Sequence, residues 1–384
     1  MLTISDIDHD PRVRKVARSL GASGYQVDVL APTTSATRSD DVGPGVRYSR
    51  ITREWLWRYF VVYQEEFRRA GLARQFDYVH ANDLTTLTTG WVLARARRVP
   101  LIYDAHELWT ENVQPTAEGW KPMSGATRVL TGAWERFLLR SVDEITTVSP
   151  SIVTEFERRS PRRVQPKLVP NYPAMELLRT VPRRPSLREE CGVSDADFLT
   201  LYLGGVNPLR NIETVIRAHA LLPTNYVFAI RGPGVEAHAA EYRALARDEG
   251  VADRVVVLSP VPMDDVVAVA QGADCGIVML RNICKNFLYF FPNKLFEYSL
   301  AGLPVAASDF PDIRSFVLAE RCGVTFDPDS PTSIAAALKR LGDDHDEARA
   351  MGERGRRSVL EERNWETAVN VLLKAYERLP RTSG

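Results

Sequence analysis

The chain has 384 residues, which is more than one ordinary hydrophobic core accommodates and predicts two domains. Its 49 lysine and arginine residues balance its 49 aspartate and glutamate residues, so the formal charge is zero. This balance excludes wholesale nucleic-acid binding, and any anion site must therefore be local. The four cysteines include no Cys-x-x-Cys pair, so they give no zinc signature and indicate a reducing compartment.

No stretch approaches the roughly eighteen apolar residues of a membrane span, and the N-terminus has no secretion signal. We therefore expect a cytoplasmic protein. Residues 55–63 are rich in aromatic side chains and bordered by arginines. We interpret them as a core helix with snorkelling arginines, and the alternative is a peripheral contact with the inner face of the membrane.

The first 170 residues alternate apolar runs with amphipathic ones, which is typical of a parallel sheet with crossover helices. We expect strands at 2–4, 25–31, 78–80, 101–103 and 144–148, and helices at 13–20, 84–96 and 126–140. Residues 158–188 contain six prolines and nine basic residues with one acid, so we expect an extended linker there.

A second alternating half follows the expected linker. We expect its strands at 198–203, 226–230, 255–258, 275–279 and 305–307, helices beginning at Ile212, Ala237, Met263 and Lys294, and closing helices over 339–376. The chain therefore predicts two doubly wound α/β halves. In such sheets ligands bind beyond the carboxyl ends of the strands, so we expect function in a cleft between the halves.

The most informative stretch is 291–305, which predicts a helix that begins after Pro292 and stops at Gly302. Lys294 and Glu297 share one face of that helix. A helix N-terminus beside a lysine can seat phosphate, and a glutamate can accept hydrogen bonds from the two hydroxyls of a ribose. A nucleoside diphosphate fits both features, although an isolated Lys-x-x-Glu pair is more often a solvated helix face.

Two further motifs follow apolar strands. Gly204 and Gly205 allow the backbone to approach a phosphate closely, and Arg210 comes five residues later. The segment Arg231-Gly-Pro-Gly234 follows the next strand, where a plain turn is the alternative.

The order of these motifs resembles the glycosyltransferases of family 4, which have the GT-B architecture. The first half contributes Asp10-Pro-Arg-Val13, Val79-His-Ala-Asn-Asp83 and Tyr103-Asp-Ala-His-Glu-Leu108 to the resemblance. It implies two Rossmann-like domains that face a central cleft. The acceptor-binding domain would span 1–172 together with a crossing helix at about 365–384, and the donor-binding domain would span 173–364.

The resemblance also implies roles for individual residues. Arg210 and Lys294 would stabilise the departing nucleoside diphosphate, and His106 would lie beside the reacting sugar. The implied donor-binding residues are Gly204, Gly205, Arg231, Gly232, Val261, Tyr289, Leu295, Phe296 and Glu297. The implied acceptor-binding residues are His9, Asp10, Arg12, Asp83 and Glu107. From the residues alone, Asp10 and Asp83 are equally good helix caps, and a lone histidine is often structural.

Two positions depart from the family pattern. Tyr289 stands where the first glutamate of the family's Glu-x7-Glu signature is usual, and Gly205 stands where relatives often carry arginine. We expect sugar recognition to differ accordingly, with Arg12 or Arg281 replacing the missing cation.

We predict a retaining glycosyltransferase that needs neither metal nor cofactor. Its donor would be a nucleotide sugar, UDP-linked before GDP-linked, and its hexose would pass to a hydroxyl of a glycan, glycolipid or natural product. The alternatives are an inverting transferase or an epimerase with His106 or Asp10 as general base or acid, and a catalytically weak sugar-nucleotide-binding protein. The sequence leaves the oligomeric state open.

Overall fold

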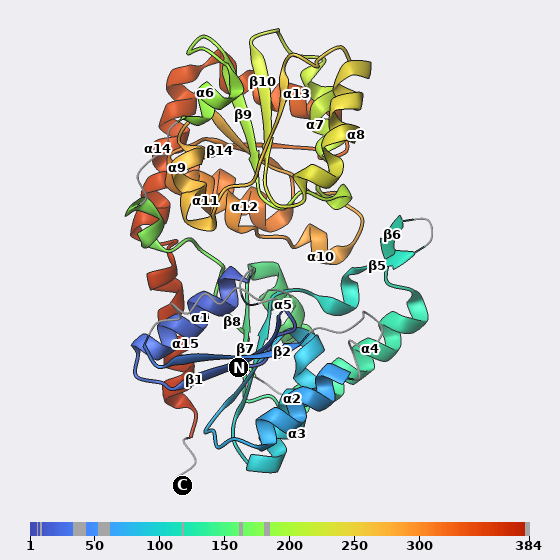
Figure 1. Cartoon of the computed structure of the whole chain (residues 1–384), viewed down its shortest axis with the longest axis vertical. Helices are drawn as coiled ribbons and strands as arrows, with labels where there is room; N and C mark the ends of the chain where they lie inside the picture. Colours follow the sequence, from blue (N-terminus) through green and yellow to red (C-terminus); the bar gives the residue numbers. More distant parts are fainter. Residues whose placement is uncertain are drawn as a thin grey trace. The chain divides into compact units, whose positions relative to one another are not determined.

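The computed structural model describes residues 1–5, 7, 10–33, 44–52, 62–116, 119–160, 164–179 and 185–380. The chain divides into two compact units (Figure 1). Unit 1 comprises residues 1–114, 122–170 and 368–384, and unit 2 comprises residues 115–121 and 171–367. Each unit is an α/β fold around a parallel sheet, as predicted. Among the described helices, none is long and apolar enough to cross a membrane.

The parallel strands of unit 1 form two ladders that Leu2 joins. These strands are β1 (Val27–Thr33), β2 (Val46–Thr52), β3 (Val79–Asn82), β4 (Leu101–Ala105), β7 (Glu144–Thr147) and β8 (Lys167–Leu168). They form two ladders, β1-β2 and β3-β4-β7-β8. Leu2 bridges both ladders through Leu30 and Ala81, so the expected strand at 2–4 is reduced to a short bridge.

The helices of unit 1 follow the predicted alternation. They are α1 (Pro11–Ala22), α2 (Val62–Leu72), α3 (Asp83–Arg97), η3 (Trp109–Glu111), α4 (Gly125–Leu138), η4 (Leu139–Ser141) and α5 (Pro150–Arg159). A separate two-stranded ladder joins β5 (Val113–Thr116) to β6 (Gly119–Pro122). Most of the aromatic run 55–63 lies outside the described residues, and α2 begins at its end.

Helix α15 (Trp365–Arg378) begins in unit 2 and ends in unit 1. In unit 1 its Tyr376 hydroxyl lies 2.8 Å from Nδ1 of the buried His80. The Tyr376 ring also packs edge-on against Tyr25 and Tyr78, with ring centroids 5.4 and 5.3 Å away. This part of α15 therefore belongs to the core of unit 1.

The sheet of unit 2 has the order β11-β10-β9-β12-β13-β14, and all its strands are parallel. They are β9 (Phe198–Leu203), β10 (Tyr226–Arg231), β11 (Val255–Leu258), β12 (Cys275–Val278), β13 (Val305–Ser308) and β14 (Gly323–Phe326). The other elements are η5 (Met175–Arg179), α6 (Leu187–Cys191), η6 (Pro208–Arg210), α7 (Ile212–His219), α8 (Val235–Asp248), η7 (Met263–Asp265), α9 (Val266–Ala270), α10 (Lys285–Leu288), α11 (Asn293–Ala301), α12 (Pro311–Glu320), α13 (Pro331–Asp343) and α14 (His345–Glu361).

Alternate residues of the central strands of unit 2 enter different hydrophobic clusters. Phe198 and Tyr202 of β9 pack with α7, α8 and α13, whereas Leu199 and Leu201 pack with α9, α11 and α12. Because both faces of a strand are buried in this way, its sequence is a continuous apolar run. The strands of the second half could therefore be predicted from the sequence.

The described residues of the expected linker over 158–188 contain more secondary structure than their composition indicates. They contain the end of α5, strand β8, η5 and the start of α6. Val169, just after β8, is fully buried, and its amide donates to the Thr147 carbonyl at 2.8 Å. The prediction of an extended linker was therefore wrong for this part, because a two-residue edge strand is too short to show a periodic pattern.

Candidate functional site

Two glycine loops follow neighbouring strands of the unit 2 sheet. Gly204 follows β9 and Gly232 follows β10, with φ angles of 151° and 146°. A Cβ on Gly232 would lie 2.0 Å from the carbonyl oxygen of Gly204, so no larger residue fits. The Gly204 amide donates to the Arg231 carbonyl at 3.0 Å. The loops therefore pack backbone to backbone at the carboxyl edge of the sheet, where ligands of such sheets bind.

The ammonium group of Lys294 lies beside the first glycine loop. This side chain on α11 is only 9% exposed, and its Nζ atom has no hydrogen-bond partner. Nζ lies 4.0 Å from the ring centroid of Tyr202, which compensates in part for lost hydration. Burial, reinforced by Arg210, holds the pKa of Lys294 well below its usual value, although Glu297 opposes this shift. An anion beside Nζ would stabilise the charged form.

A second cation belongs to the same region. Arg210 ends η6, and its guanidinium carbon lies 5.5 Å from the ring centroid of Phe290. Its Nε atom is buried without a hydrogen-bond partner. The repulsion between Arg210 and Lys294 contributes to the low pKa of the lysine, so the two charges act on one another. Two neighbouring cations with unpaired nitrogens favour a ligand with more than one negative charge.

The other predicted donor residues have varied surroundings. Glu297 is half-buried one turn after Lys294 on α11. Arg231 is buried, and both its terminal nitrogens donate to the carboxylate of Glu190. That salt bridge takes up the charge of Arg231, which argues against a direct contact with phosphate.

Five more predicted donor residues differ in exposure. Leu295 and Phe296 belong to the hydrophobic core of unit 2, so their side chains do not face a ligand. Val261 is half-buried before η7, and Tyr289, after α10, lies under the ammonium of Lys285 at 5.5 Å. Gly205 is exposed. Arg281, the expected replacement cation, donates to the Pro208 carbonyl at 2.9 Å.

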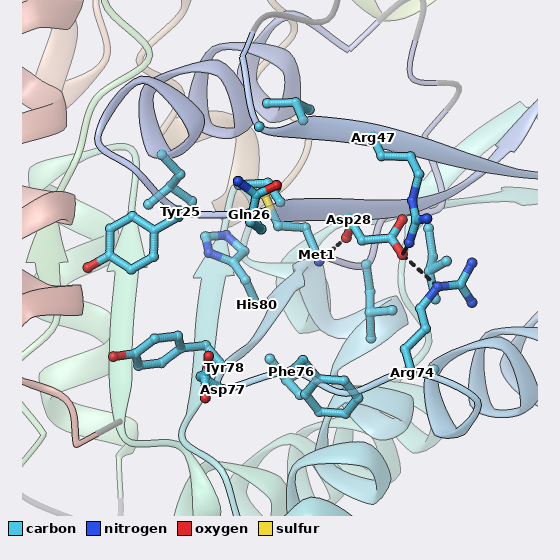
Figure 2. A pocket seen from close by; sticks show the side chains of 18 of the residues that line it. Met1, Tyr25, Gln26, Asp28, Arg47, Arg74, Phe76, Asp77, Tyr78 and His80 are labelled. Carbon is cyan, nitrogen blue, oxygen red and sulfur yellow. Dashed lines mark hydrogen bonds and ion pairs between the residues drawn. The ribbon is translucent and has the colours of Figure 1, made fainter. Parts of the chain in front are cut away.

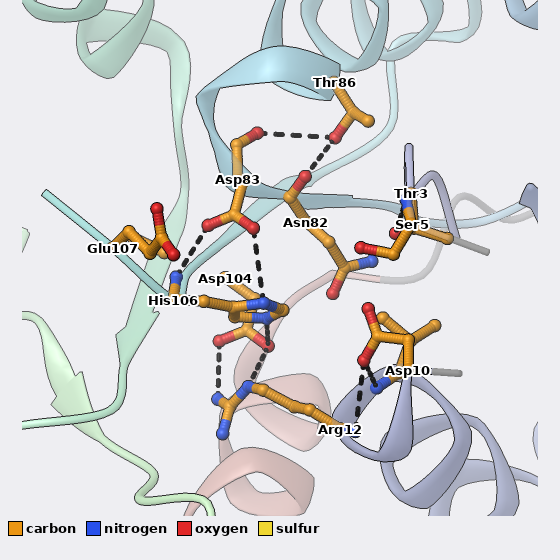
Figure 3. A network of polar contacts seen from close by, with 12 residues as sticks. Thr3, Ser5, Asp10, Arg12, Asn82, Asp83, Thr86, Asp104, His106 and Glu107 are labelled. Atoms are coloured by element: carbon orange, nitrogen blue, oxygen red, sulfur yellow. Dashed lines mark hydrogen bonds and ion pairs between the residues drawn. The ribbon is translucent and has the colours of Figure 1, made fainter. Parts of the chain in front are cut away.

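A network of polar contacts centres on Asp104 in unit 1 (Figure 3). Its carboxylate accepts from Nε and Nη2 of Arg12, at 2.9 and 2.7 Å, and from the Thr146 hydroxyl at 2.7 Å. It also lies 3.0 Å from Nε2 of His106. Burial raises the pKa of Asp104, but Arg12 and His106 outweigh it and hold that pKa well below its usual value. Asp104 is therefore a buried carboxylate anion.

His106 is held between two carboxylates. Its amide donates to Asp83 Oδ1 at 2.8 Å, and its Nδ1 atom lies 3.3 Å from Asp83 Oδ2. Burial lowers the pKa of His106, but Asp83 and Asp104 outweigh it and raise that pKa to about 10. The ring is thus an imidazolium at neutral pH with both nitrogens engaged. This state argues against a role of the ring as a general base.

The predicted acceptor residues have local partners in unit 1. Asp10 caps α1 by accepting from the amides of Arg12 and Val13. Arg12 is buried, with its remaining nitrogen on the Val169 carbonyl at 2.7 Å, so the structure disfavours contact with phosphate or acceptor. Asp83 has a φ angle of 61° and orients His106 instead of capping a helix.

Two predicted acceptor residues remain. Glu107 is exposed, and His9 lies outside the described residues.

Sequence analysis missed Asp104 and Tyr298 as members of these sites. Asp104 precedes His106 by two residues, and alternation along a strand places such residues on one face, so this signal was available. Tyr298 accepts a hydrogen bond from the Leu203 amide at 2.7 Å, just before the glycine loop. Nothing in the sequence indicates that contact between residues far apart in the chain.

A cavity of about 820 Å³ opens elsewhere in unit 1 (Figure 2). Four of its charged groups contact one another: Arg47 and Arg74 contact the carboxylate of Asp28 at 2.8 and 2.5 Å, and the Met1 ammonium donates to the Asp28 carbonyl at 2.7 Å. Its lining includes none of the predicted site residues. We therefore describe two candidate sites, the glycine loops of unit 2 and the Asp104 network of unit 1.

Comparison with known families matches nearly the whole chain. Residues 10–172 match the glycosyl transferase 4-like domain, and residues 183–358 match the glycosyl transferases group 1 domain. A D-inositol 3-phosphate glycosyltransferase of Corynebacterium kroppenstedtii is 24% identical over 89% of this chain and 78% of its own length. One of Geodermatophilus obscurus is 26% identical over 95% of this chain and 83% of its own length.

Solved structures share the fold. Sucrose-phosphate synthase from Thermosynechococcus elongatus has a TM-score of 0.79 at 20% identity, over 98% of this chain and 97% of that chain. HepE of Anabaena, solved with UDP and glucose, has a TM-score of 0.76 at 15% identity, over 98% of both chains. At such identities the likeness shows a shared architecture.

Proposed function

The chain belongs to the glycosyltransferases of family 4, and from this membership we propose that it is a retaining enzyme that uses a nucleoside diphosphate sugar. The prediction of a GT-B glycosyltransferase is confirmed at this level. We further propose that a hexose passes to a hydroxyl of a glycan, a glycolipid or a natural product.

The observation that carries the proposal is the pair of cations beside the first glycine loop. Lys294 Nζ and Arg210 Nε are buried without hydrogen-bond partners. Breaking a sugar–phosphate bond leaves negative charge on the diphosphate, and preorganised cations stabilise that charge as it develops. A diphosphate also provides several acceptor oxygens for both groups. The described geometry therefore suits a departing nucleoside diphosphate better than a neutral ligand.

We propose roles for three further groups on the basis of their chemistry. The backbone at Gly204 would admit a phosphate close to the sheet, and Glu297 would accept hydrogen bonds from ribose hydroxyls. The carbonyl of His106 would face the sugar, because its ring nitrogens are engaged by Asp83 and Asp104. In the proposed retaining step, the acceptor hydroxyl attacks on the face that the diphosphate leaves, and a diphosphate oxygen takes the proton.

Two finer choices are part of the proposal. We propose that the reaction needs no metal, because Lys294 and Arg210 supply the positive charge that a metal ion provides elsewhere. We propose UDP before GDP because the structurally similar HepE was solved with UDP and with UDP-glucose. The names of the relatives add D-inositol 3-phosphate to the acceptors worth testing.

Calorimetric titration with UDP, GDP and ADP, each with and without Mg²⁺, tests the donor site. We expect micromolar binding of one diphosphate that does not depend on Mg²⁺. Arg210→Ala and Glu297→Ala should each weaken binding at least about tenfold, the size of one lost charge-assisted contact. Arg217→Ala is the matched control, because Arg217 is half exposed on α7 and pairs with Glu249. Absence of binding to all three nucleotides would refute the proposed donor class.

Stereochemistry and turnover are tested with the donor that binds. NMR of the product formed on D-inositol 3-phosphate, or on a panel of hydroxyl acceptors, should show the anomeric configuration of the donor. A product of inverted configuration would overturn the retaining mechanism while leaving the donor site intact. Chelation with EDTA should leave the rate unchanged, and a rate restored by added metal would contradict the metal-independent chemistry.

A further inference from the structure

Helix α4 presents an apolar stripe to solvent. Ala126, Val129, Leu130, Ala133, Trp134 and Phe137 recur at helical spacing, and all are exposed. Val129 and Leu130 are 67% and 72% exposed, whereas Glu135 and Leu138 on the opposite face are buried. Among the described residues, the other large exposed apolar side chains are scattered one to an element or loop. A gathered stripe of this kind marks an interaction surface.

The stripe is anchored to α3 and does not fold back onto the core of unit 1. The Trp134 indole nitrogen donates to the Thr88 hydroxyl at 3.0 Å. The Trp134 and Phe137 rings stack at 5.2 Å, and Phe137 meets Trp91 of α3 at 5.7 Å. These contacts hold the rings in place while leaving their outer faces exposed. The surface is therefore preformed.

Arginines border this surface without acidic partners. Arg136 is on α4 and Arg140 is just past its end, while Arg95 and Arg98 are on the neighbouring end of α3. In the described part of the chain, no carboxylate forms a salt bridge with any of these four guanidinium groups. Arg95 lies instead over the Trp91 ring at 5.4 Å. A cavity of about 380 Å³ lies here, lined by Trp91, Ala94, Arg95, Arg98, Val99, Leu101 and Ser141.

We propose that α4, with the adjoining arginines of α3, docks unit 1 on an anionic lipid bilayer. The apolar stripe would enter the boundary between headgroups and acyl chains, and the arginines would contact lipid phosphates. An anionic bilayer offers apolar acyl chains to the stripe and negative phosphates to the arginines. A second copy of the chain meets only the apolar stripe, because the one acidic residue of α4, Glu135, is buried and cannot pair with the arginines. This inference does not depend on the proposed donor or acceptor.

Flotation with two kinds of vesicle tests the proposal. One is phosphatidylcholine alone, and the other contains about 30% phosphatidylglycerol, enough to give an anionic surface. We expect the full chain to float with the anionic vesicles at least about tenfold more than with the neutral ones, and less at high salt. Equal binding to both vesicles, or binding to neither, would overturn the proposal.

Two variants and two matched controls assign the contact to α4. Leu130→Ser should reduce binding several-fold, whereas Leu318→Ser, at a residue 65% exposed on α12, should not. Arg136→Glu with Arg140→Glu should abolish binding, whereas Arg243→Glu with Arg357→Glu, at exposed positions of unit 2, should not. All four proteins should unfold in urea at the wild-type concentration if the substitutions leave the fold intact. Vesicle binding that survives in both α4 variants would refute this surface, as would a dimer in light scattering that Leu130→Ser dissociates.

Discussion

The ammonium nitrogen of Lys294 lies 2.5 Å from the point that a Cβ atom on Gly204 would occupy. A side chain at residue 204 would therefore displace the ammonium group of Lys294 from the loop. The same residue has a φ angle of 151°, which side chains rarely tolerate.

Gly204→Ala should fold and yet bind nucleotide poorly. The added methyl group would push the flexible lysine away from the loop and strain the backbone by about 1–3 kcal/mol. We expect UDP affinity to fall at least about tenfold, measured by calorimetry. Gly205→Ala is the control, because a Cβ there meets no atom within 4 Å. Equal affinities of the two variants would show that the closeness of Gly204 and Lys294 has no part in binding.

Nucleotide binding should be accompanied by proton uptake. Burial holds the pKa of Lys294 well below its usual value in the free protein. A bound diphosphate stabilises the charged ammonium and raises that pKa. Between the free and bound pKa values, the lysine therefore gains a proton as the ligand binds.

Calorimetry in buffers of different ionisation enthalpy measures this uptake. At about pH 8 the diphosphate is already ionised and contributes little. The apparent enthalpy of UDP binding should then vary with the buffer, and the variation should vanish in Lys294→Met if that protein still binds. Buffer-independent enthalpies in the wild type at every pH tested would contradict the prediction.

The sequence revealed the parts of this fold that repeat along the chain. Strands β9 and β10 are buried on both faces, so their apolar runs, and the glycines that end them, could be read directly. The placement of Lys294 and Glu297 one turn apart on the same helix was also predictable, because helical spacing is a local property.

Contacts between distant residues could not be predicted in this way. Arg12 was expected to meet a ligand, but it pairs with Asp104, 92 residues away. Only the packing of α1 against β4 decides that partnership. His106 was expected beside the reacting sugar, and that role stays a prediction. The sequence did not reveal that a carboxylate contacts each of its ring nitrogens.

Tyr298→Phe should disturb the first glycine loop from within the core. The Tyr298 hydroxyl accepts from the Leu203 amide at 2.7 Å, where β12 no longer pairs with β9. Without this hydroxyl, the buried Leu203 amide loses its hydrogen-bond acceptor, which lowers the free energy of unfolding by about 1–3 kcal/mol. Urea unfolding should show this lower stability. UDP binding should also weaken, because Leu203 directly precedes Gly204 of the glycine loop. Tyr242→Phe, in the other hydrophobic cluster of unit 2, should leave UDP binding unchanged.

Asp104→Asn should destabilise unit 1 strongly. The substitution leaves the buried guanidinium of Arg12 without its anion, which typically costs about 3–5 kcal/mol. Asp28→Asn is the control in the same unit, because Asp28 pairs with arginines that are partly or largely exposed. Asp28→Asn should therefore lower the free energy of unfolding by only about 0–1 kcal/mol. Similar unfolding free energies for the two variants would mean that the Asp104 network contributes little to stability.

The stabilising effect of His106 should disappear at high pH. Because the folded state raises the pKa of His106 from 6.5 to about 10, folding favours the protonated ring. This contribution is complete below the unfolded pKa of about 6.5 and is lost as the pH rises through about 10. His106→Gln should therefore be less stable than the wild type near pH 6, and the difference should shrink steadily toward pH 10. Urea unfolding across this range measures it, and a difference that stays constant would show that His106 is not held as a cation by Asp83 and Asp104.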